Sequence, residues 1–377
     1  MYLVFLSHLI AIVYASMKYD YIVIGGGVIG MTTSREIAAR GASIAIIDRQ
    51  NFGNGASKVA GGILSSMRPW DENIDSHKLS EESKKNYSEF IFKLQEESGI
   101  NVEFIKSGLI IMNEEHSEKT KKWAINNDIK LTQEIDNNYP DINIPSYSIL
   151  LPEIYQIRPP LLLNALHKSL QKKSVDMFEN SNISNIEIID NKFRCITLDS
   201  GEKIYADNLI ITAGAWTDLL LKKIKTSANI KPIRGQMLCV KLKNLTINSI
   251  VLDEGNYLIP RLDGHVLVGS TMEDVGFMNK TTQIAKDELL NWMYSIIADK
   301  KKIDVLDHWS GLRPAVDIGK PVIGNIPDFE NIFINTGHFR KGILQAPASA
   351  QLLADYLFKN TSFMDIDRFS LGTIEKI

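Results

Sequence analysis

The chain has 377 residues, of which 44% are hydrophobic and 23% are charged, so its size and composition suit a folded enzyme with one large or two medium domains. Its 42 basic and 45 acidic residues give a formal net charge of -3, which provides no overall positive field for nucleic acid or anionic lipid. Cys195 and Cys239 are the only cysteines, and neither has metal-ligand spacing. We therefore expect no metal, no nucleic-acid partner and two reduced core thiols.

The first sixteen residues, MYLVFLSHLIAIVYAS, are mostly apolar and end in small residues. They lack the basic start of a secretion signal and are shorter than the roughly 20 residues of a membrane span. Because Met17 stands directly before the first predicted strand, we interpret residues 1–16 as an extension created by a mis-assigned start, with a targeting segment as the alternative. We expect a cytoplasmic protein without a membrane span.

Residues 19–49 predict a strand, a helix and a second strand: YIVIGGG is a β-branched run, VIGMTTSREIAARG has helical spacing, and ASIAIID is again apolar. Gly25 suits the tight turn, Gly27 the approach of a diphosphate, and Gly30 the close packing of helix on strand. Asp48 ends the second strand, where a carboxylate can accept hydrogen bonds from a ribose. The unit predicts a dinucleotide site, but NAD and FAD both fit it.

Small residues follow this unit in NGASKVAGGILSS, residues 54–66. Small side chains let the backbone approach a bulky ligand closely, although the run by itself also fits a flexible loop. Further along, YADNLIITAGAW predicts a buried strand that ends at Gly214. YLIPR and HVLVGST flank the turn LDG and predict a β-hairpin.

The last third of the chain predicts two helices. TTQIAKDELLNWMYSIIADKK has an amphipathic pattern whose apolar face is expected to pack in the core. That face contains Ile284, Leu289, Trp292, Met293 and Ile296. ENIFINTGHFRKGILQAPASAQLLADYL predicts a strand, a glycine-bounded loop and a helix from about Ala346, which would bring a second helix N-terminus toward the cofactor.

Six segments, taken in their order and spacing, resemble the D-amino-acid oxidase family of FAD-dependent amine oxidases, most closely the glycine oxidases of thiamine biosynthesis. They are IVIGGGVIG, GASKVAGGIL, ADNLIITAGAW, YLIPRLDGHVLVGSTM, WSGLRPAVDIGKPVIG and NTGHFRKGILQAPASAQLLADYL. The resemblance implies an α/β fold, α+β overall, in which a Rossmann-like FAD-binding domain is interleaved with a smaller substrate domain built on an antiparallel sheet. The FAD-binding domain would use residues 17–90, 150–226 and 318–377, and the substrate domain residues 91–149 and 227–317.

The resemblance also implies an activity. It is the oxidation of glycine or a related small amino acid or amine, with hydride transfer from the α-carbon to flavin N5, an imine product, and reoxidation by O2 to give H2O2. A role in thiamine thiazole synthesis, a thiazole synthase partner and a homo-oligomer are consistent with it. Two alternatives stay open: a D-amino-acid dehydrogenase that passes electrons to a quinone or carrier, and a non-catalytic nucleotide-binding regulatory subunit.

Four residues are candidates for the substrate pocket. Arg313 in GLRPA matches the family's substrate arginine, and a planar guanidinium can hold a carboxylate at two points. Tyr257 can add a hydroxyl and Met272 an apolar wall, with core packing as the alternative for both. Arg340 faces the substrate by resemblance, with flavin or a carboxylate of its own protein as alternative partners. Because hydride transfer from a neutral amine needs no protein base, the acid–base candidates are interpreted as surface or structural groups: Asp253, Glu254, His265 and His308.

The expected cofactor contacts come from the glycine-rich turn, the small-residue run and the late glycine-bounded loop. They are Gly25, Gly27, Val28, Ile29, Gly30, Asp48, Arg49, Ser57, Gly61, Gly62, Ile63, Ile183, Gly214, His338, Phe339, Lys341, Gly342, Ile343 and Leu344. Some glycine oxidases have a histidine where this chain has Gly255, two residues before Tyr257, which puts strict glycine preference in doubt. No cysteine follows Arg313 in RPAVDIGKP, so FAD is expected to bind non-covalently.

Overall fold

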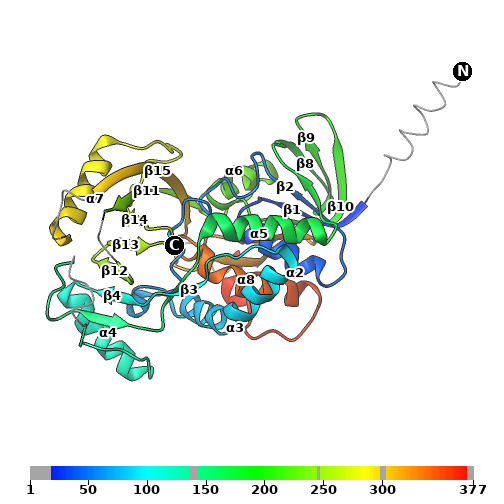
Figure 1. Ribbon diagram of the computed structural model, residues 1–377. Helices are drawn as coiled ribbons and strands as arrows, with labels where there is room; N and C mark the ends of the chain where they lie inside the picture. Colours follow the sequence, from blue (N-terminus) through cyan, green and yellow to red (C-terminus); the bar gives the residue numbers. More distant parts are fainter. Residues whose placement is uncertain (1–17, 136–141, 244–246, 298–302, 372–377) are drawn as a thin grey trace, which may run out of the picture.

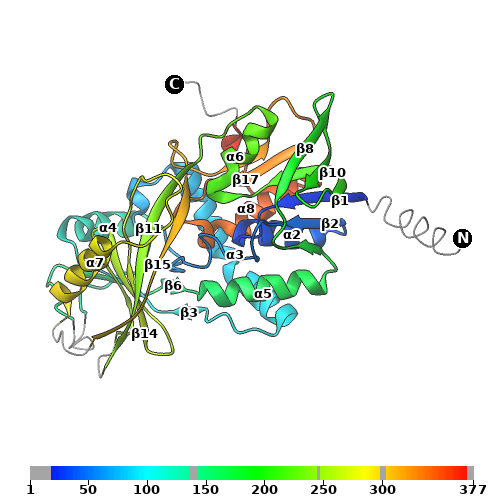
Figure 2. The same ribbon diagram turned by 90° about the horizontal axis from the view of Figure 1, so that it is seen from above.

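The computed structural model describes residues 18–135, 142–243, 247–297 and 303–371, so the predicted extension at residues 1–16 lies outside the described part. Two sheets occupy opposite halves of the molecule, and most of the long helices pack on the first of them (Figures 1 and 2). Within the described residues, no helix is both long enough and apolar enough to cross a membrane.

The first sheet has a parallel centre. Strands β17, β10, β1, β2 and β7 run parallel in that order, β16 pairs antiparallel with β17, and β8 and β9 form an antiparallel ribbon on β10. Their bounds are β1 Lys18–Ile24, β2 Ile44–Ile47, β7 Asp176–Phe178, β8 Ile183–Ile189, β9 Lys192–Leu198, β10 Lys203–Ile211, β16 Val322–Asn325 and β17 Ile332–Thr336. At the centre of the sheet the last residues of β1 and β10 and all of β2 and β17 are buried, because both faces of the sheet are covered there.

Successive side chains of these strands point to opposite faces. Val23 and Ile46 pack against the long helices, whereas Ile22 and Ile47 pack toward the β8–β9 ribbon and the segment after β10. The helices on the first face are α2 Val28–Ala38, α3 Ile74–Ser98, α5 Pro159–Lys172 and α8 Gly342–Leu357. The segment after β10 contains η2 Gly214–Trp216, α6 Thr217–Leu221 and η3 Lys222–Ile224.

Helix α8 begins at Gly342 and not at Ala346 as the sequence suggested. Pro347 lies inside this helix and has no N–H to donate to the carbonyl oxygen of Ile343. That oxygen instead accepts a hydrogen bond of 2.9 Å from the hydroxyl group of Tyr87 on α3. The neighbouring helix therefore satisfies the group that the proline leaves unpaired, and the helix starts one turn earlier.

The second sheet has the strand order β15, β11, β14, β13, β12, β4, β5, and its neighbours are antiparallel except for the pair β12 and β4. The bounds are β4 Leu109–Ile111, β5 Ile149–Leu151, β11 Lys231–Leu242, β12 Ile250–Asp253, β13 Asn256–Pro260, β14 His265–Gly269 and β15 Ile303–Ala315. The predicted hairpin is β13 and β14. The remaining elements are η1 Pro69–Asp71, β3 Ile105–Lys106, α4 Glu114–Asn126, β6 Tyr155–Gln156, α7 Gln283–Ile296 and η5 Ile366–Phe369.

Helix α7 covers one face of the second sheet. Leu289, Met293 and Ile296 are buried there, as predicted, and Trp292 is partly buried. Ile284 corrects the predicted stripe, because it lies in the first turn of the helix and is 73% exposed. Cys195 is buried, but the thiol expected in the core at Cys239 is only partly buried.

The alternation of side chains along β13 decides which of its residues face the site. Leu258 faces α7, while Tyr257 and Ile259 face the other side of the sheet, toward the first half of the molecule. The predicted domain division stays a prediction. Two of its boundaries, at residues 90 and 150, fall inside α3 and β5.

Candidate active site

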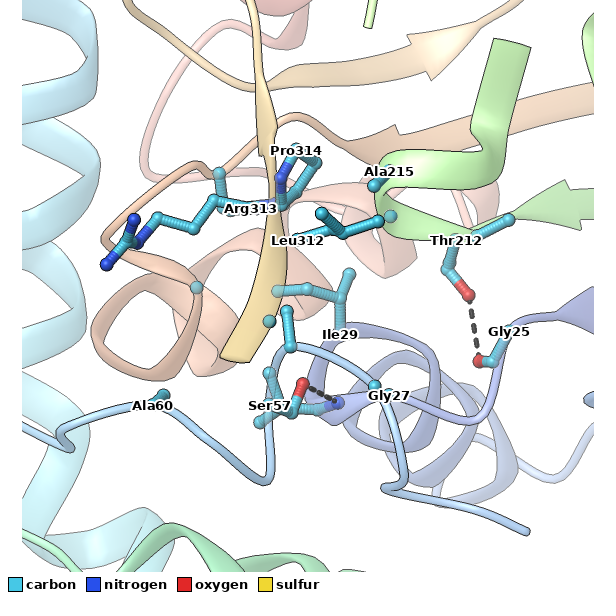
Figure 3. Close-up of a pocket in the computed structure, with 18 of the residues that line it drawn as sticks. Gly25, Gly27, Ile29, Ser57, Ala60, Thr212, Ala215, Leu312, Arg313 and Pro314 are labelled. Atoms are coloured by element: carbon cyan, nitrogen blue, oxygen red, sulfur yellow. Dashed lines mark hydrogen bonds between the residues drawn. The ribbon is translucent and has the colours of Figure 1, made fainter. Parts of the chain in front are cut away.

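One long cavity receives residues from both halves of the molecule. On the first side it is lined by the turn between β1 and α2, the end of β2, and the segments that follow β10 and β17. On the second side it is lined by β11, β13 and β15, and the small-residue run at 54–66 passes along it (Figure 3). The cavity therefore joins the predicted nucleotide turn to the predicted substrate residues.

The glycine-rich turn at one end of the cavity has no room for side chains. Gly25 has a φ of 120°, and a Cβ there would lie 2.5 Å from the carbonyl oxygen of Thr212. A Cβ at Gly30 would lie 1.7 Å from the carbonyl oxygen of Gly25. The Thr212 hydroxyl fixes the turn by donating to that same oxygen at 3.1 Å (Figure 3). Gly25 thus makes the turn, and Gly30 lets α2 pack on it.

The N-terminus of α2 points into the cavity, where Gly27, Val28 and Ile29 line the wall. Gly27 precedes the helix and offers no side-chain cap, and the N–H of Val28 donates to the Ser57 hydroxyl at 3.0 Å (Figure 3). The N–H groups and the dipole of a helix N-terminus favour an anion. This end of the cavity fits a diphosphate.

Asp48 lines the same end and is already engaged with the backbone. Its two carboxylate oxygens accept hydrogen bonds from the N–H groups of Gly26, at 2.7 Å, and Gln50, at 2.8 Å. Burial raises the pKa of Asp48 above its ordinary value, and these two N–H groups oppose the rise. The carboxylate keeps free lone pairs, so it can hold the glycine-rich turn and still accept a hydrogen bond from a ribose.

We expect Asp48→Ala to weaken FAD binding by about tenfold to a hundredfold, because hydrogen bonds to a charged group contribute about 1.5 to 3 kcal/mol. The measurement is titration of the apoprotein with FAD, followed by flavin fluorescence. Asp20→Ala is the matched control, since Asp20 also accepts a backbone hydrogen bond, from Ser43 at 2.7 Å, but does not line the cavity. Equal FAD dissociation constants for wild type and Asp48→Ala would remove the assignment of Asp48 to the ribose.

Arg313 lies at the opposite end of the cavity, on β15 (Figure 3). Its guanidinium donates to the carbonyl oxygen of Thr271 at 3.1 Å and to the Ser270 hydroxyl at 2.7 Å. On the neighbouring strand a Cβ at Gly235 would lie 2.1 Å from both terminal nitrogens of Arg313. Gly235 therefore creates the space that the guanidinium fills, and the two oxygen partners fix its orientation.

Tyr257 and Arg340 line the same end. The Tyr257 ring packs over Gly269, where a Cβ would lie 2.9 Å from the ring, and its hydroxyl donates to the Met237 sulfur at 3.7 Å. The loop that carries Arg340 is tied to β15, because the N–H of Phe339 donates to the carbonyl oxygen of Pro314 at 3.0 Å. Three of the four predicted substrate residues are thus brought together.

His338 supplies a polar group in the buried part of the cavity. It is 3% exposed, and neither ring nitrogen has a hydrogen-bond partner among the described residues. Burial lowers the pKa of His338 to about 3, so the ring is neutral and offers one donor and one acceptor. Unpaired polar atoms are costly in a protein interior, and a planar ligand that carries donors and acceptors, such as a flavin, would satisfy them.

The other predicted cofactor residues that line the cavity are Arg49, Gly61, Gly62, Ile63, Ile183, Gly214, Phe339, Gly342 and Ile343. Four predicted residues do not line it. Gly30 and Leu344 are buried beside it, and Lys341 pairs with Glu72. Met272 is 66% exposed and lines a separate hollow, because the chain after β14 turns Thr271 toward Gln236 and so turns the next side chain outward.

Several lining residues were missed from the sequence. Gly235 had a usable signal, since a glycine inside a strand often marks the close approach of another group. Thr212 and Met237 had none, because their neighbours in the cavity come from distant parts of the chain.

The fold and the cavity define a dinucleotide-dependent oxidoreductase: a glycine turn and helix N-terminus for the diphosphate, a buried polar ring, and a cationic far end. Residues 20–356 match the family described as FAD dependent oxidoreductase, DAO, and the chain belongs to that family. FAD is therefore its cofactor, and the residues present at the cavity fit it.

Relatives and solved structures agree with this assignment. Glycine oxidase of Pseudomonas aeruginosa is 30% identical over 356 residues, which cover 93% of this chain and 97% of that protein. The bifunctional protein ThiO/ThiG of Trichormus variabilis is 25% identical over 96% of this chain and 56% of that protein. The structure of glycine oxidase from Geobacillus kaustophilus has a TM-score of 0.87 and 24% identity, covers 94% of this chain and 99% of that one, and shows the shared fold.

Proposed function

We propose that the chain oxidises glycine or a related small amino acid or amine at its α-carbon. When bound, FAD supplies the acceptor for the hydride and passes the electrons to O2 as H2O2. The oxidation converts the amine of the substrate to an imine, and water then converts this imine to an oxo acid and ammonia. The glycine oxidase relatives support the substrate class, and the composition of the far end of the cavity supports it independently.

The convergence of Arg313, Arg340 and Tyr257 at one end carries this proposal. Among the described residues that line the cavity, Asp48 is the only acid, and it lies at the opposite end, beside the glycine-rich turn. The far end thus presents two guanidinium groups and a hydroxyl without an acidic side chain. Such a set binds a carboxylate, and Arg313 is already oriented by Ser270 and Thr271 for a two-point contact.

The residues of this chain mainly orient the substrate. A carboxylate held by Arg313 leaves the α C–H free to point along the cavity, and Tyr257 limits how far the small side chain extends. His338 is neutral, and no acidic side chain among the described residues lines the substrate end. The substrate must therefore arrive as the neutral amine, because the described residues at this end include no carboxylate that could take a proton from an ammonium group.

A link to thiamine thiazole formation is part of the proposal. The ThiO/ThiG relative is longer than the part that matches this chain, which covers 56% of it. Its name pairs the matching part with a second protein. We propose that a thiazole synthase takes the imine from this chain before water does. A cytoplasmic location is also proposed, as expected from the sequence.

An anaerobic visible spectrum of the purified holoenzyme tests the activity. Glycine, sarcosine, D-alanine and D-proline are mixed in turn with the yellow protein, and bleaching identifies the substrate class. Air is then admitted, and one H2O2 per substrate consumed is the result expected of an oxidase. Bleaching without peroxide would favour a dehydrogenase with another electron acceptor, and no bleaching by any amine would overturn the proposal.

The rate of flavin reduction at limiting substrate should rise toward alkaline pH. The neutral amine is the reactive form, and its fraction rises about tenfold per pH unit below the pKa of the amine. His338 adds no titration near neutral pH, because its pKa is about 3. Stopped-flow reduction from pH 6 to 10 measures the profile, and a flat profile would contradict the proposal that the protein supplies no base.

A further inference from the structure

The connection between β14 and α7 supplies the groups that hold Arg313. Its first two residues provide the Ser270 hydroxyl and the Thr271 carbonyl oxygen, which accept hydrogen bonds from the guanidinium at 2.7 and 3.1 Å. Because Arg313 itself lies on β15, the position of these two oxygen atoms must be fixed by other contacts. The orientation of the guanidinium therefore depends on what holds the connection in place.

Strand β11 contacts both Arg313 and the connection. Gly235 lines the cavity and leaves the space that the Arg313 guanidinium fills. Because successive side chains of a strand point to opposite faces, Arg234 and Gln236 point away from the cavity, and both are buried. The backbone of Arg234 pairs with that of Glu273, in the connection, by two hydrogen bonds of 2.9 Å. The strand that makes room for the guanidinium is thus also the strand that holds the connection.

The carboxylate of Glu273 joins these side chains. One of its oxygens accepts hydrogen bonds from the Thr271 hydroxyl, at 2.6 Å, and from the Gln236 side-chain amide, at 2.8 Å. The other oxygen pairs with the guanidinium of Arg234. The Thr271 hydroxyl also accepts a hydrogen bond of 2.9 Å from the backbone N–H of Gln236. The residue whose carbonyl oxygen orients Arg313 is therefore itself held by Glu273.

Glu273 is ionised and lies outside the cavity. Burial raises the pKa of Glu273, but hydrogen bonds from its three partners outweigh this effect and lower the pKa to about 2. With Arg234 it lines the separate hollow that also contains Met272. Arg234 is 3% exposed, and a buried guanidinium that loses its carboxylate partner is strongly destabilised, so the surrounding chain would rearrange. Removal of the carboxylate would thus displace Thr271 without any direct effect on a ligand in the cavity.

We propose that Glu273 is a positioning residue for substrate binding. It holds the Thr271 carbonyl oxygen, and through this oxygen it keeps the Arg313 guanidinium in the orientation that takes a carboxylate at two points. The inference rests on the proposed function, in which Arg313 binds the carboxylate of the substrate. A purely structural role would cause the same loss whether or not Arg313 is present, whereas a positioning role loses its effect when Arg313 is removed.

A double-mutant cycle on flavin reduction tests the proposal. Wild type, Glu273→Gln, Arg313→Met and the double variant are reduced anaerobically at limiting concentrations of the amine that reduces the wild type fastest. We expect Glu273→Gln to lower the second-order rate constant about tenfold in the wild type and less than about twofold in the Arg313→Met background. Asp317→Asn is the matched control, because Asp317 also pairs with a residue of β11, Lys231 at 2.9 Å, but on the surface, so the rate constant should not change.

Binding of an unreactive carboxylate gives a readout that needs no oxidation. Methoxyacetate carries a carboxylate but no amine, and calorimetric titration of the holoenzyme measures its dissociation constant. We expect Glu273→Gln to raise this constant about tenfold, while the affinity for FAD changes less than about twofold. An unchanged affinity for methoxyacetate in Glu273→Gln would overturn the inference.

A milder variant covers the case in which Glu273→Gln fails to fold. Thr271→Val keeps the carbonyl oxygen and the ion pair of Glu273 with Arg234 but removes the hydroxyl link, so we expect flavin reduction to slow about fivefold. Thr282→Val removes another hydroxyl of the same network, which accepts a hydrogen bond from Gln236 at 3.1 Å and caps α7, and it should leave the rate unchanged. Equal rates for Thr271→Val and the wild type would contradict the positioning role.

The same measurements separate this inference from the proposed function. Oxidation of amines by the wild type, with an equal loss from Glu273→Gln in both backgrounds, overturns the inference and leaves the proposed function intact. No reduction of the flavin by any amine overturns the proposed function itself.

Discussion

Replacing Arg313 by methionine is expected to lower the efficiency of substrate oxidation about thirtyfold to several-thousandfold while FAD stays bound. The substrate carboxylate would lose its charged partner in a cavity shielded from water, and such losses cost about 2 to 5 kcal/mol. At about 1.4 kcal/mol per tenfold change, this cost gives the stated range. Anaerobic stopped-flow reduction at limiting substrate measures it, and the flavin spectrum reports bound FAD.

Lysine at position 313 is the informative comparison with methionine, because it keeps the positive charge. Arg313 uses separate nitrogens for the Thr271 carbonyl and the Ser270 hydroxyl, and its planar group still has donors left for a carboxylate. An ammonium group cannot reproduce this arrangement, so Arg313→Lys should restore only part of the lost efficiency. An amine without a carboxylate should be a poor substrate for the wild type and no poorer for Arg313→Met. Equal slowing of both substrates, or release of FAD, would contradict the role of Arg313 and make Arg340 the next residue to test.

The features that the sequence predicted well depend on local rules. The β1–α2 turn needs glycine at Gly25 and Gly30 because of contacts within a few residues and with one neighbouring strand. The hairpin of β13 and β14 is set by a tight turn and by alternation, which also places Tyr257 on the face opposite α7. Patterns of this kind are visible in a single sequence because they repeat at the spacing of the element itself.

The features that the sequence did not predict depend on partners far apart in the chain. Lys341 was expected at the flavin but pairs with Glu72, 269 residues earlier, and this pair was invisible before the segments were placed. Met272 follows a predicted strand, yet its direction is decided by the Thr271 hydroxyl, which accepts a hydrogen bond from the N–H of Gln236 and donates one to Glu273.

Gly30→Ala is expected to destabilise the protein by about 3 kcal/mol, the upper end of the usual cost of overpacking, and to abolish FAD binding. The added Cβ would lie 1.7 Å from the carbonyl oxygen of Gly25 and 2.6 Å from the Thr212 hydroxyl. A backbone oxygen cannot move aside as the tip of a flexible side chain can, so α2 must shift away from the turn. That shift breaks the hydrogen bond from Thr212 to Gly25 and moves the helix N-terminus that faces the diphosphate.

Two other glycines separate packing from cofactor contact. A Cβ at Gly255 would meet nothing within 4 Å, so Gly255→Ala should keep both the melting temperature and the FAD affinity of the wild type. A Cβ at Gly27 would meet only the Ser57 hydroxyl, at 3.3 Å, so Gly27→Ala should fold nearly as well as the wild type. Because Gly27 lines the cavity at the N-terminus of α2, the same variant should still bind FAD more weakly. Thermal unfolding of the apoproteins and FAD titration of each variant measure the two effects. A Gly30→Ala apoprotein as stable as the wild type would show that the turn yields to the added methyl group and that Gly30 is not required for the packing of α2.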